Sequence, residues 1–169
     1  MPAAVPRTPL PAFALAALTA LGAACGEQIG DECALSSDCS PQGDRVCAVT
    51  SPGGDCTIAG CDFDTCPDES VCIRFFSGAS SDRTCDPRAE DISEDACTAD
   101  ELCTLSGTCV PRTAEVRFCM RTCESQDDCR EGYECRDEQL MREHGGEPVM
   151  PPGQALPDDP QPFCATAPF

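Results

Sequence analysis

Cysteine is the residue type with the most chemistry to offer in this chain, because a thiol can form a disulfide, bind a metal or act as a nucleophile. The chain has 17 cysteines among 169 residues. None of them forms the Cys-x-x-Cys pair that a zinc ribbon or a thioredoxin-type redox site requires. A reducing cytosol does not sustain so many thiols, so we expect an oxidising compartment in which the cysteines form disulfides.

The cysteines follow a repeating spacing from Cys33 onward. The first eight are separated by 5, 7, 8, 4, 4, 5 and 12 residues, and the next eight by 5, 5, 9, 3, 5, 5 and 28. Agreement within two residues at six successive gaps predicts a tandem pair of eight-cysteine modules in which every cysteine is bridged. The predicted disulfide-forming residues are Cys33, Cys39, Cys47, Cys56, Cys61, Cys66, Cys72, Cys85, Cys97, Cys103, Cys109, Cys119, Cys123, Cys129, Cys135 and Cys164.

The two modules span residues 33–85 and 97–164, and a polar, proline-containing linker of residues 86–96 joins them. Residues 165–169 form a short tail. Spacing alone does not fix the pairing, because eight cysteines allow about a hundred connectivities. A crossed arrangement, first with third and second with fourth in each half-module, closes short local loops. It predicts the pairs Cys61–Cys72, Cys66–Cys85, Cys123–Cys135 and Cys129–Cys164.

The apolar content is too low for an ordinary hydrophobic core. Leu, Ile, Val and Phe make up about 14% of residues 25–169, below the roughly 20% under which a strongly charged chain is usually disordered. Each disulfide adds roughly 2–4 kcal/mol by restricting the unfolded chain, so eight of them can replace the missing core. We therefore expect a small disulfide-rich fold, mostly irregular, with short β-hairpins and one short helix.

Local patterns place these few elements. The alternating residues 45–49 and 71–75 predict strands, and residues 134–143 predict the helix. The proline-rich residues 145–163 predict an extended or mobile loop that Cys164 closes. The few aromatic side chains are expected to pack against the disulfides: Phe75, Phe76, Phe118, Tyr133 and Phe163.

The charge of the chain excludes one large class of partner. There are 30 acidic residues and 11 basic ones, all of them Arg, and the net charge is −19. Such a surface repels nucleic acid and anionic lipid head groups. The chain has no Lys and no Asn, whose codons are rich in A, but many Ala, Gly, Pro and Arg. This bias indicates a GC-rich bacterial genome.

The N-terminal segment is typical of an exported protein. Arg7 precedes an uncharged run of thirteen residues that ends in small side chains, so residues 1–24 are predicted to be a signal peptide. The run is too short for a permanent membrane span, which needs about 20 residues. It ends in Leu21-Gly22-Ala23-Ala24-Cys25, which resembles a bacterial lipoprotein signal, where the cysteine becomes the lipidated N-terminus.

This resemblance implies that Cys25 carries a lipid and that residues 25–32 are a short tether to the membrane. Lipidation also leaves sixteen cysteines, an even number that can pair completely. Gly26 after the cysteine favours the outer membrane, by resemblance to the sorting rule of enteric bacteria. Ordinary signal peptidase also accepts Gly22-x-Ala24, and cleavage there would leave Cys25 unlipidated.

Two motifs recur in the cysteine-rich part, Cys33-x-x-x-x-Asp38-Cys39 and Cys123-x-x-x-x-Asp128-Cys129-x-x-Gly132-x-x-Cys135. With the lipoprotein-like signal, they resemble the Cys-rich lipoproteins of myxobacteria over residues 21–135. The resemblance implies localisation in the cell envelope and a structure held together by disulfides, and it implies no activity. The implied partners are the membrane, through a lipid anchor on Cys25, and a protein or polysaccharide that the sequence does not identify.

No residue pattern indicates catalysis, a bound metal or a cofactor. The only histidine, His144, lies beside Gly145-Gly146 in the predicted loop, without the rigid surroundings that a catalytic triad needs. Acidic pairs offer the oxygen ligands that Ca²⁺ prefers, but none has the spacing of an EF-hand. These pairs are Asp62-x-Asp64, Glu90-Asp91, Glu94-Asp95 and Asp127-Asp128.

The sequence therefore predicts a non-enzymatic, lipid-anchored protein of the bacterial cell envelope that acts as a structural or binding module. Two alternatives remain open. One is a secreted Cys-rich protease inhibitor, which presents a rigid loop and carries no lipid on Cys25. The other is a calcium-dependent adhesion module.

Overall fold

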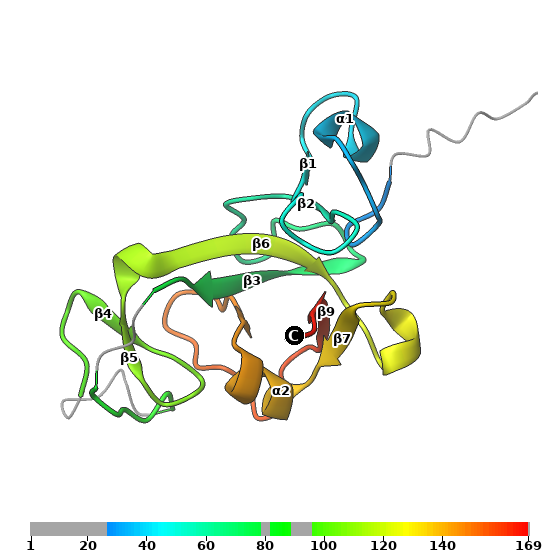
Figure 1. Ribbon diagram of the computed structural model, residues 1–169. Coiled ribbons are helices and arrows are strands. Elements are labelled where there is room, and N and C mark those ends of the chain that lie inside the picture. The colour runs from blue at the N-terminus through cyan, green and yellow to red at the C-terminus, as the bar shows by residue number, and fades with distance from the viewer. Residues whose placement is uncertain (1–26, 79–81, 89–95, 169) are drawn as a thin grey trace, which may run out of the picture.

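A long antiparallel strand pair runs through the middle of the structure, a computed structural model that describes residues 27–78, 82–88 and 96–168 (Figure 1). Its strands are β3 (Ser70–Phe76) and β6 (Glu115–Arg121), and β8 (Glu147–Pro148) pairs with the other edge of β3. The remaining strands of the described residues form two-stranded sheets: β1 (Val46–Cys47) with β2 (Cys56–Thr57), β4 (Glu101–Cys103) with β5 (Cys109–Pro111), and β7 (Tyr133–Arg136) with β9 (Phe163–Thr166).

The helices are short. They are α1 (Ser36–Cys39), α2 (Glu138–His144) and the 3-10 turns η1 (Arg112–Ala114) and η2 (Gln126–Asp128). The predicted class, a small disulfide-rich fold with short β-hairpins, is confirmed, although a second, single-turn α-helix accompanies the expected one. Within the part of the chain that the structure describes, no helix is long and apolar enough to cross a membrane.

The helix α2 begins four residues later than predicted. Cys135 lies in strand β7 opposite Cys164, so the start of the predicted helix is extended instead. The helix begins after Asp137, whose side chain accepts a hydrogen bond from the Leu140 backbone N–H at 3.0 Å, and ends before Gly145, whose φ is 80°. The residues that were predicted to begin the helix instead pair with β9, whose Cys164 is held in place by the disulfide to Cys129.

The proline-rich segment is extended, as predicted, but it is held at several points. Its first residues form β8 on the edge of β3, where Arg74 lies opposite Glu147. The following stretch, residues 149–162, is called the strap. Val149 and Pro160 of the strap are buried. The chain therefore lies against the sheet before it enters β9.

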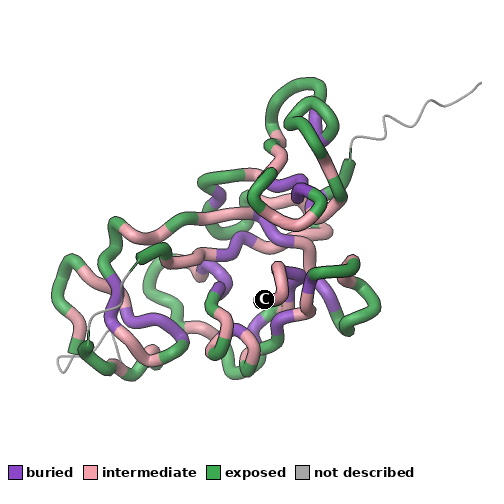
Figure 2. The backbone as a smooth tube through the Cα atoms, viewed as in Figure 1, coloured by how far each residue is buried: buried purple, intermediate pink, exposed green. Residues whose placement is uncertain are grey.

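The two faces of the central sheet are covered differently. One face carries Ile73 and Met120, which pack with Phe163, Leu105 and other apolar residues into a small core. Phe75 packs edge-on against Phe163, with ring centroids 6.1 Å apart. Phe118 also packs on this core, and Tyr133 is buried, so four of the five predicted aromatic residues contribute to the interior. The buried positions follow this sheet and β9 in Figure 2.

The opposite face carries sulfur. Cys72 and Cys119 lie opposite each other in the register of β3 and β6 and pack with Cys61, Ile29 and Val149. Successive side chains along a strand point to opposite faces, so Cys72 and Cys119 lie on one face while their chain neighbours Ile73 and Met120 lie on the other. The sheet is therefore held between a hydrocarbon cluster and a disulfide cluster, which explains how so few apolar residues suffice.

All sixteen cysteines from Cys33 onward form disulfides, and they divide into four units of four with one connectivity. In each unit the first cysteine bonds to the third and the second to the fourth. The third and fourth lie opposite each other in an antiparallel strand pair. The units are Cys33, Cys39, Cys47 and Cys56 (unit 1); Cys61, Cys66, Cys72 and Cys119 (unit 2); Cys85, Cys97, Cys103 and Cys109 (unit 3); Cys123, Cys129, Cys135 and Cys164 (unit 4).

Unit 3 is inserted into unit 2. It lies between Cys72 and Cys119, beyond the ends of β3 and β6, at one end of the molecule in Figure 1. The predicted pair Cys66–Cys85 is therefore wrong, because Cys66 bonds to Cys119 and Cys85 to Cys103. The other three predicted pairs are present. Closing a longer loop costs little more entropy than closing a shorter one, so sequence distance was a poor guide.

These two disulfides also link the predicted modules, residues 33–85 and 97–164, to each other. The crossed connectivity holds for four units of four cysteines instead of two blocks of eight. The predicted linker, residues 86–96, lies inside unit 3, between its first and second cysteines.

The inserted unit can be removed in a test of this arrangement. Residues 77 and 114 meet across the hairpin, where the Ser77 N–H donates to the Ala114 carbonyl at 3.0 Å. We expect that replacing residues 78–113 with an Asn-Gly turn leaves a folded protein with six disulfides. Loss of the buried Leu105 should lower the free energy of unfolding by roughly 2–3 kcal/mol. Hydrogen exchange should still show protected amides in β3 and β6, and free thiols at Cys66 and Cys119 would contradict the insertion.

Candidate functional site

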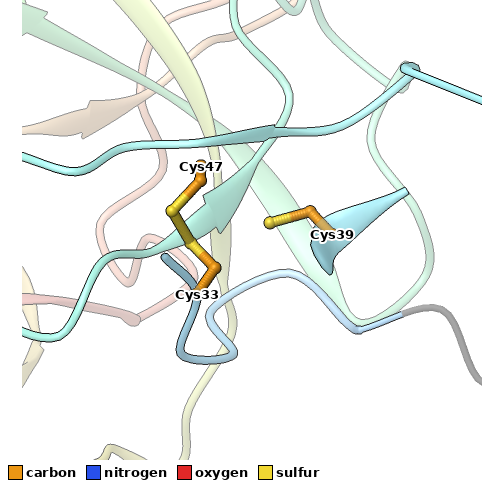
Figure 3. A group of neighbouring side chains, drawn as sticks. All are labelled: Cys33, Cys39 and Cys47. Atoms are coloured by element: carbon orange, nitrogen blue, oxygen red, sulfur yellow. A yellow bond between two sulfur atoms is a disulfide. The ribbon is translucent and has the colours of Figure 1, made fainter. Parts of the chain in front are cut away.

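The sulfur atoms of each unit lie close together. In every unit three Sγ atoms are within 4.8 Å of one another, and in unit 1 these belong to Cys33, Cys39 and Cys47. Figure 3 shows the Sγ of Cys39 pointing towards the Cys33–Cys47 disulfide. A metal binds cysteine as the thiolate, whereas all of these atoms are bonded to another sulfur. The clusters are therefore neighbouring disulfides that act as the core of each unit.

The aspartates of the two recurring motifs cap turns. The Asp38 carboxylate accepts the backbone N–H groups of Ala34 and Leu35 at 3.0 and 2.8 Å. Asp128 accepts those of residues 124 and 125 in the same way, both at 2.9 Å. These hydrogen bonds lower the pKa of both carboxyl groups below its ordinary value. The Cys-x-x-x-x-Asp-Cys motif thus encodes a capped turn between the first two cysteines of a unit.

The other candidate calcium ligands are not gathered into a site within the described residues. Asp62 pairs with the Arg117 guanidinium at 2.9 Å. The pairs Glu90-Asp91 and Glu94-Asp95 lie outside the described residues. Among the residues that the structure describes, the only groups of three or more candidate ligands at metal-site distances are the disulfide cysteines. The calcium alternative therefore gains no support from the geometry.

The histidine lies in an ordered network and not in the loose segment that the sequence suggested. His144 Nδ1 lies 2.7 Å from a Glu134 carboxylate oxygen, and the same oxygen accepts a hydrogen bond from Arg136 Nε. The Arg136 side chain is buried and also donates to the carbonyls of His144, Gly145 and Thr166. This arginine ties the end of α2 to β7 and β9, so the role of the network is structural.

An ion pair between a half-buried arginine and a buried aspartate joins unit 1 to unit 4. Arg130 donates to Asp55 at 3.2 Å and to the Pro52 carbonyl at 3.0 Å, and its guanidinium carbon stacks 3.9 Å from the centre of the Tyr133 ring. Burial raises the pKa of Asp55 to about 6, although the arginine opposes this shift. Burial and the nearby Asp55 raise the pKa of Tyr133 to about 12. The pair holds the projecting unit 1 against the rest of the molecule.

The raised pKa of Asp55 predicts a dependence of stability on pH. Because the folded state binds this proton more tightly than the unfolded state does, the contribution of Asp55 is most favourable below pH 4. It falls as the pH rises towards 6. The loss is at most roughly 2–3 kcal/mol, from about two pKa units. Urea unfolding with intact disulfides should show that wild type loses stability relative to Asp55→Asn between pH 4 and pH 7. A difference in the free energy of unfolding between wild type and Asp55→Asn that stays constant from pH 4 to pH 7 would contradict the raised pKa of Asp55.

A cleft of about 660 Å³ lies between the central sheet, unit 3 and the strap. Four arginines line it, and its acidic lining residues are Asp62, Glu101 and Glu147. Among the arginines, Arg74 and Arg117 lie directly opposite each other in the register of β3 and β6. The remaining two are Arg88 and Arg112.

Glu147 determines how Arg74 lies in this cleft. The carboxylate is almost fully buried, and one oxygen accepts from Arg74 Nε at 2.8 Å while the other accepts the Leu105 backbone N–H at 2.7 Å. Burial raises the pKa of Glu147, and Arg74 opposes that shift. The glutamate therefore connects three parts of the fold that the chain leaves far apart: β3, β8 and unit 3.

No pattern in the sequence indicated this cleft. Arginines 74, 88, 112 and 117 come from a strand, a turn, the 3-10 turn η1 and another strand, without common spacing. Only the strand register and the nesting of unit 3 bring them together, and neither follows from local pattern. Cys25, the predicted lipidation site, lies outside the described residues. No protein-family model, curated protein or solved structure matches the chain.

Proposed function

We propose that this chain is a lipid-anchored, non-enzymatic binding module of the bacterial cell envelope. The observation that carries the proposal is the number of cysteines left over once all disulfides are formed. All sixteen cysteines from Cys33 onward are paired with one another, and the chain has 17 in total. Cys25 is therefore left without a cysteine in this chain to bond, at the position where the lipoprotein-like sequence calls for a lipid.

The disulfides themselves require an oxidising compartment outside the cytosol, such as the periplasm or the cell exterior. An attachment point at Cys25 is only four residues from Ile29, which is buried in the disulfide cluster, so the folded part would lie within about 15 Å of the membrane surface. The −19 charge then favours a module whose acidic surface faces away from anionic head groups. By the resemblance of Gly26, we place the anchor in the outer membrane.

The binding role is supported by the lack of catalytic surroundings at the one histidine. Among the described residues the hydrogen-bond partner of the His144 ring is Glu134, and no hydroxyl or thiol group forms a hydrogen bond with it. A general base needs such a partner or a positioned water within hydrogen-bond reach. The rigid, disulfide-linked units and the arginine-lined cleft suit recognition better than turnover.

Mass spectrometry of the mature N-terminus tests the anchor. We expect the N-terminal peptide to begin at Cys25 and to carry a diacylglyceryl group, and we expect Cys25→Ser to release the protein from the membrane fraction. A mature protein that begins at Cys25 without any lipid would overturn the anchor. It would leave the binding role of the cleft to be tested separately.

One observation favours the inhibitor as a second candidate. The four residues between Cys61 and Cys66 form a tight loop in which the Thr65 hydroxyl donates to the Asp62 carbonyl at 2.8 Å, and Phe63 is 48% exposed there. An exposed aromatic side chain on a loop between two disulfides is a rigid feature that a protein partner can bind. This candidate requires an unlipidated Cys25, so the same mass measurement decides between the two.

A further inference from the structure

Two like charges face each other in the central sheet. Arg74 and Arg117 are directly opposite across β3 and β6, on the face that borders the cleft. Like charges in such a pair are destabilising unless something neutralises them. Arg74 pairs with Glu147 on the neighbouring strand β8, and Arg117 pairs with Glu115, two residues earlier on β6. These carboxylates balance the pair and leave the space between the sheet and unit 3 lined by guanidinium groups.

Arg74, Arg117 and a third cleft residue, Arg112, each keep at least one hydrogen-bond donor in the space between the sheet and unit 3 without a partner in the described part of the chain. Arg74 uses Nε and Nη2 on Glu147, and Arg117 uses Nε and Nη1 on its carboxylates, so one terminal nitrogen of each has no acceptor among the described residues. Arg112 donates only through Nε, to the Ala99 carbonyl at 3.0 Å. Both of its terminal nitrogens therefore remain available to a ligand.

Arg112 stands apart from the other arginines. Of the ten that the structure describes, nine form an ion pair with a carboxylate, and Arg112 forms none there. In a protein with 30 acidic residues and 11 basic ones, an arginine without a carboxylate partner is unexpected on charge alone. It is exposed at the mouth of the cleft, on η1 immediately before β6.

We propose that the cleft binds a small anionic ligand, whose carboxylate or phosphate oxygens accept hydrogen bonds from Arg74, Arg112 and Arg117. The inference specifies the ligand class of the binding role proposed above and rests on that role, although it does not require lipid attachment. Guanidinium groups bind both kinds of oxyanion in a bidentate manner, and such bonds are about twice as strong as neutral ones. A volume of about 660 Å³ suits a small molecule or a single charged group of a larger one.

Glu147 acts as a positioning residue for this site. Because its carboxylate is buried and bonded to Arg74 and to Leu105, it fixes the angle of the Arg74 guanidinium while unit 3 closes the other side. The strap forms a further wall, from Val149 to Leu156. The acidic surface beyond the cleft repels anions at long range, so recognition depends on these short-range donors.

Calorimetric titration of the mature protein in detergent tests the proposal, with inorganic phosphate in one series and succinate in another. We expect saturable binding of at least one probe, and Arg112→Gln should weaken it about tenfold or more. Arg112→Lys keeps the charge but loses the planar guanidinium, so its affinity should lie between those of wild type and Arg112→Gln. Arg45→Gln removes the same charge in unit 1, far along the chain from the cleft lining, and should leave the affinity unchanged.

The two series separate the sources of the oxyanion. Binding of phosphate alone assigns the cleft to phosphate esters, binding of succinate alone assigns it to carboxylates, and each result supports the proposal. Melting temperatures of Arg112→Gln and Arg45→Gln that match wild type confirm that both variants fold. Absence of saturable binding by both probes, or equal affinities of wild type and Arg112→Gln, overturns it. Either failure leaves a lipid found on Cys25 unaffected.

Discussion

Replacing both Cys66 and Cys119 with alanine is expected to lower the free energy of unfolding by about 5 kcal/mol. This disulfide spans 53 residues, the longest separation in the protein, and closing such a loop in the unfolded chain accounts for about 4 kcal/mol. Cys119 is fully buried on the sulfur side of the central sheet, so the lost packing adds about 1 kcal/mol. Urea unfolding under non-reducing conditions measures the change.

The matched control removes a disulfide of the inserted unit. Replacing Cys85 and Cys103 with alanine opens a shorter loop of 18 residues, for which about 3 kcal/mol is expected. Its effect should stay within unit 3, because both of its cysteines belong to that unit. Hydrogen exchange should lose protection in the central sheet for the first variant and keep it for the second. Equal loss of protection in both variants would contradict the central place of the Cys66–Cys119 disulfide.

Gly54→Ala is expected to destabilise unit 1 by roughly 4 kcal/mol or more, or to prevent its native disulfides from forming. Gly54 has a φ of 71°, and a Cβ there would lie 1.9 Å from the Cys33 carbonyl oxygen and 2.9 Å from the Cys47 Sγ. The Cys33 carbonyl oxygen belongs to backbone that the Cys33–Cys47 disulfide holds in place, so it cannot move away from the added Cβ without distorting that disulfide. Thermal unfolding and a free-thiol assay on the purified variant measure the effect.

Gly43→Ala is the matched control for this substitution. Gly43 also has a positive φ, 82°, and also lies in unit 1, but a Cβ there would meet no atom within 4 Å. It should cost only the roughly 1–2 kcal/mol of a left-handed conformation in a residue with a side chain. If the two alanine variants lost equal stability, backbone conformation alone would explain Gly54, and the close approach to Cys33 would have no measurable role.

The sequence was most informative where the cysteines act locally. The crossed pairing within Cys123, Cys129, Cys135 and Cys164 was predicted, because these four cysteines follow one another along the chain without an intervening unit. The same reasoning failed at Cys66, since it had no means to detect that a complete unit interrupts another between Cys72 and Cys119. An insertion of this kind leaves no mark on the local spacing, and the agreement between two series of seven gaps concealed it.

Long-range contacts were equally hidden from local pattern. Glu147 reads as one polar residue at the start of a proline-rich loop, yet it is buried between Arg74 and Leu105. Arg136 reads as one charged residue of the predicted helix and His144 as part of the loose segment after it, yet they hold the end of α2 to β7 and β9. In each case the partner is fixed by the disulfide units, which bring distant stretches of chain side by side and so create buried polar groups without a periodic signal.

Tryptic mapping without reduction tests the nested four-unit arrangement most directly. Every cleavage site is an arginine, and Cys66, Cys85, Cys103 and Cys119 fall on four different fragments, 46–74, 84–88, 89–112 and 118–121. The arrangement predicts that fragment 118–121 is bonded to 46–74 and that fragment 84–88 is bonded to 89–112. Fragment 84–88 bonded to 46–74, together with 118–121 bonded to 89–112, would contradict it and restore two separate modules of eight cysteines.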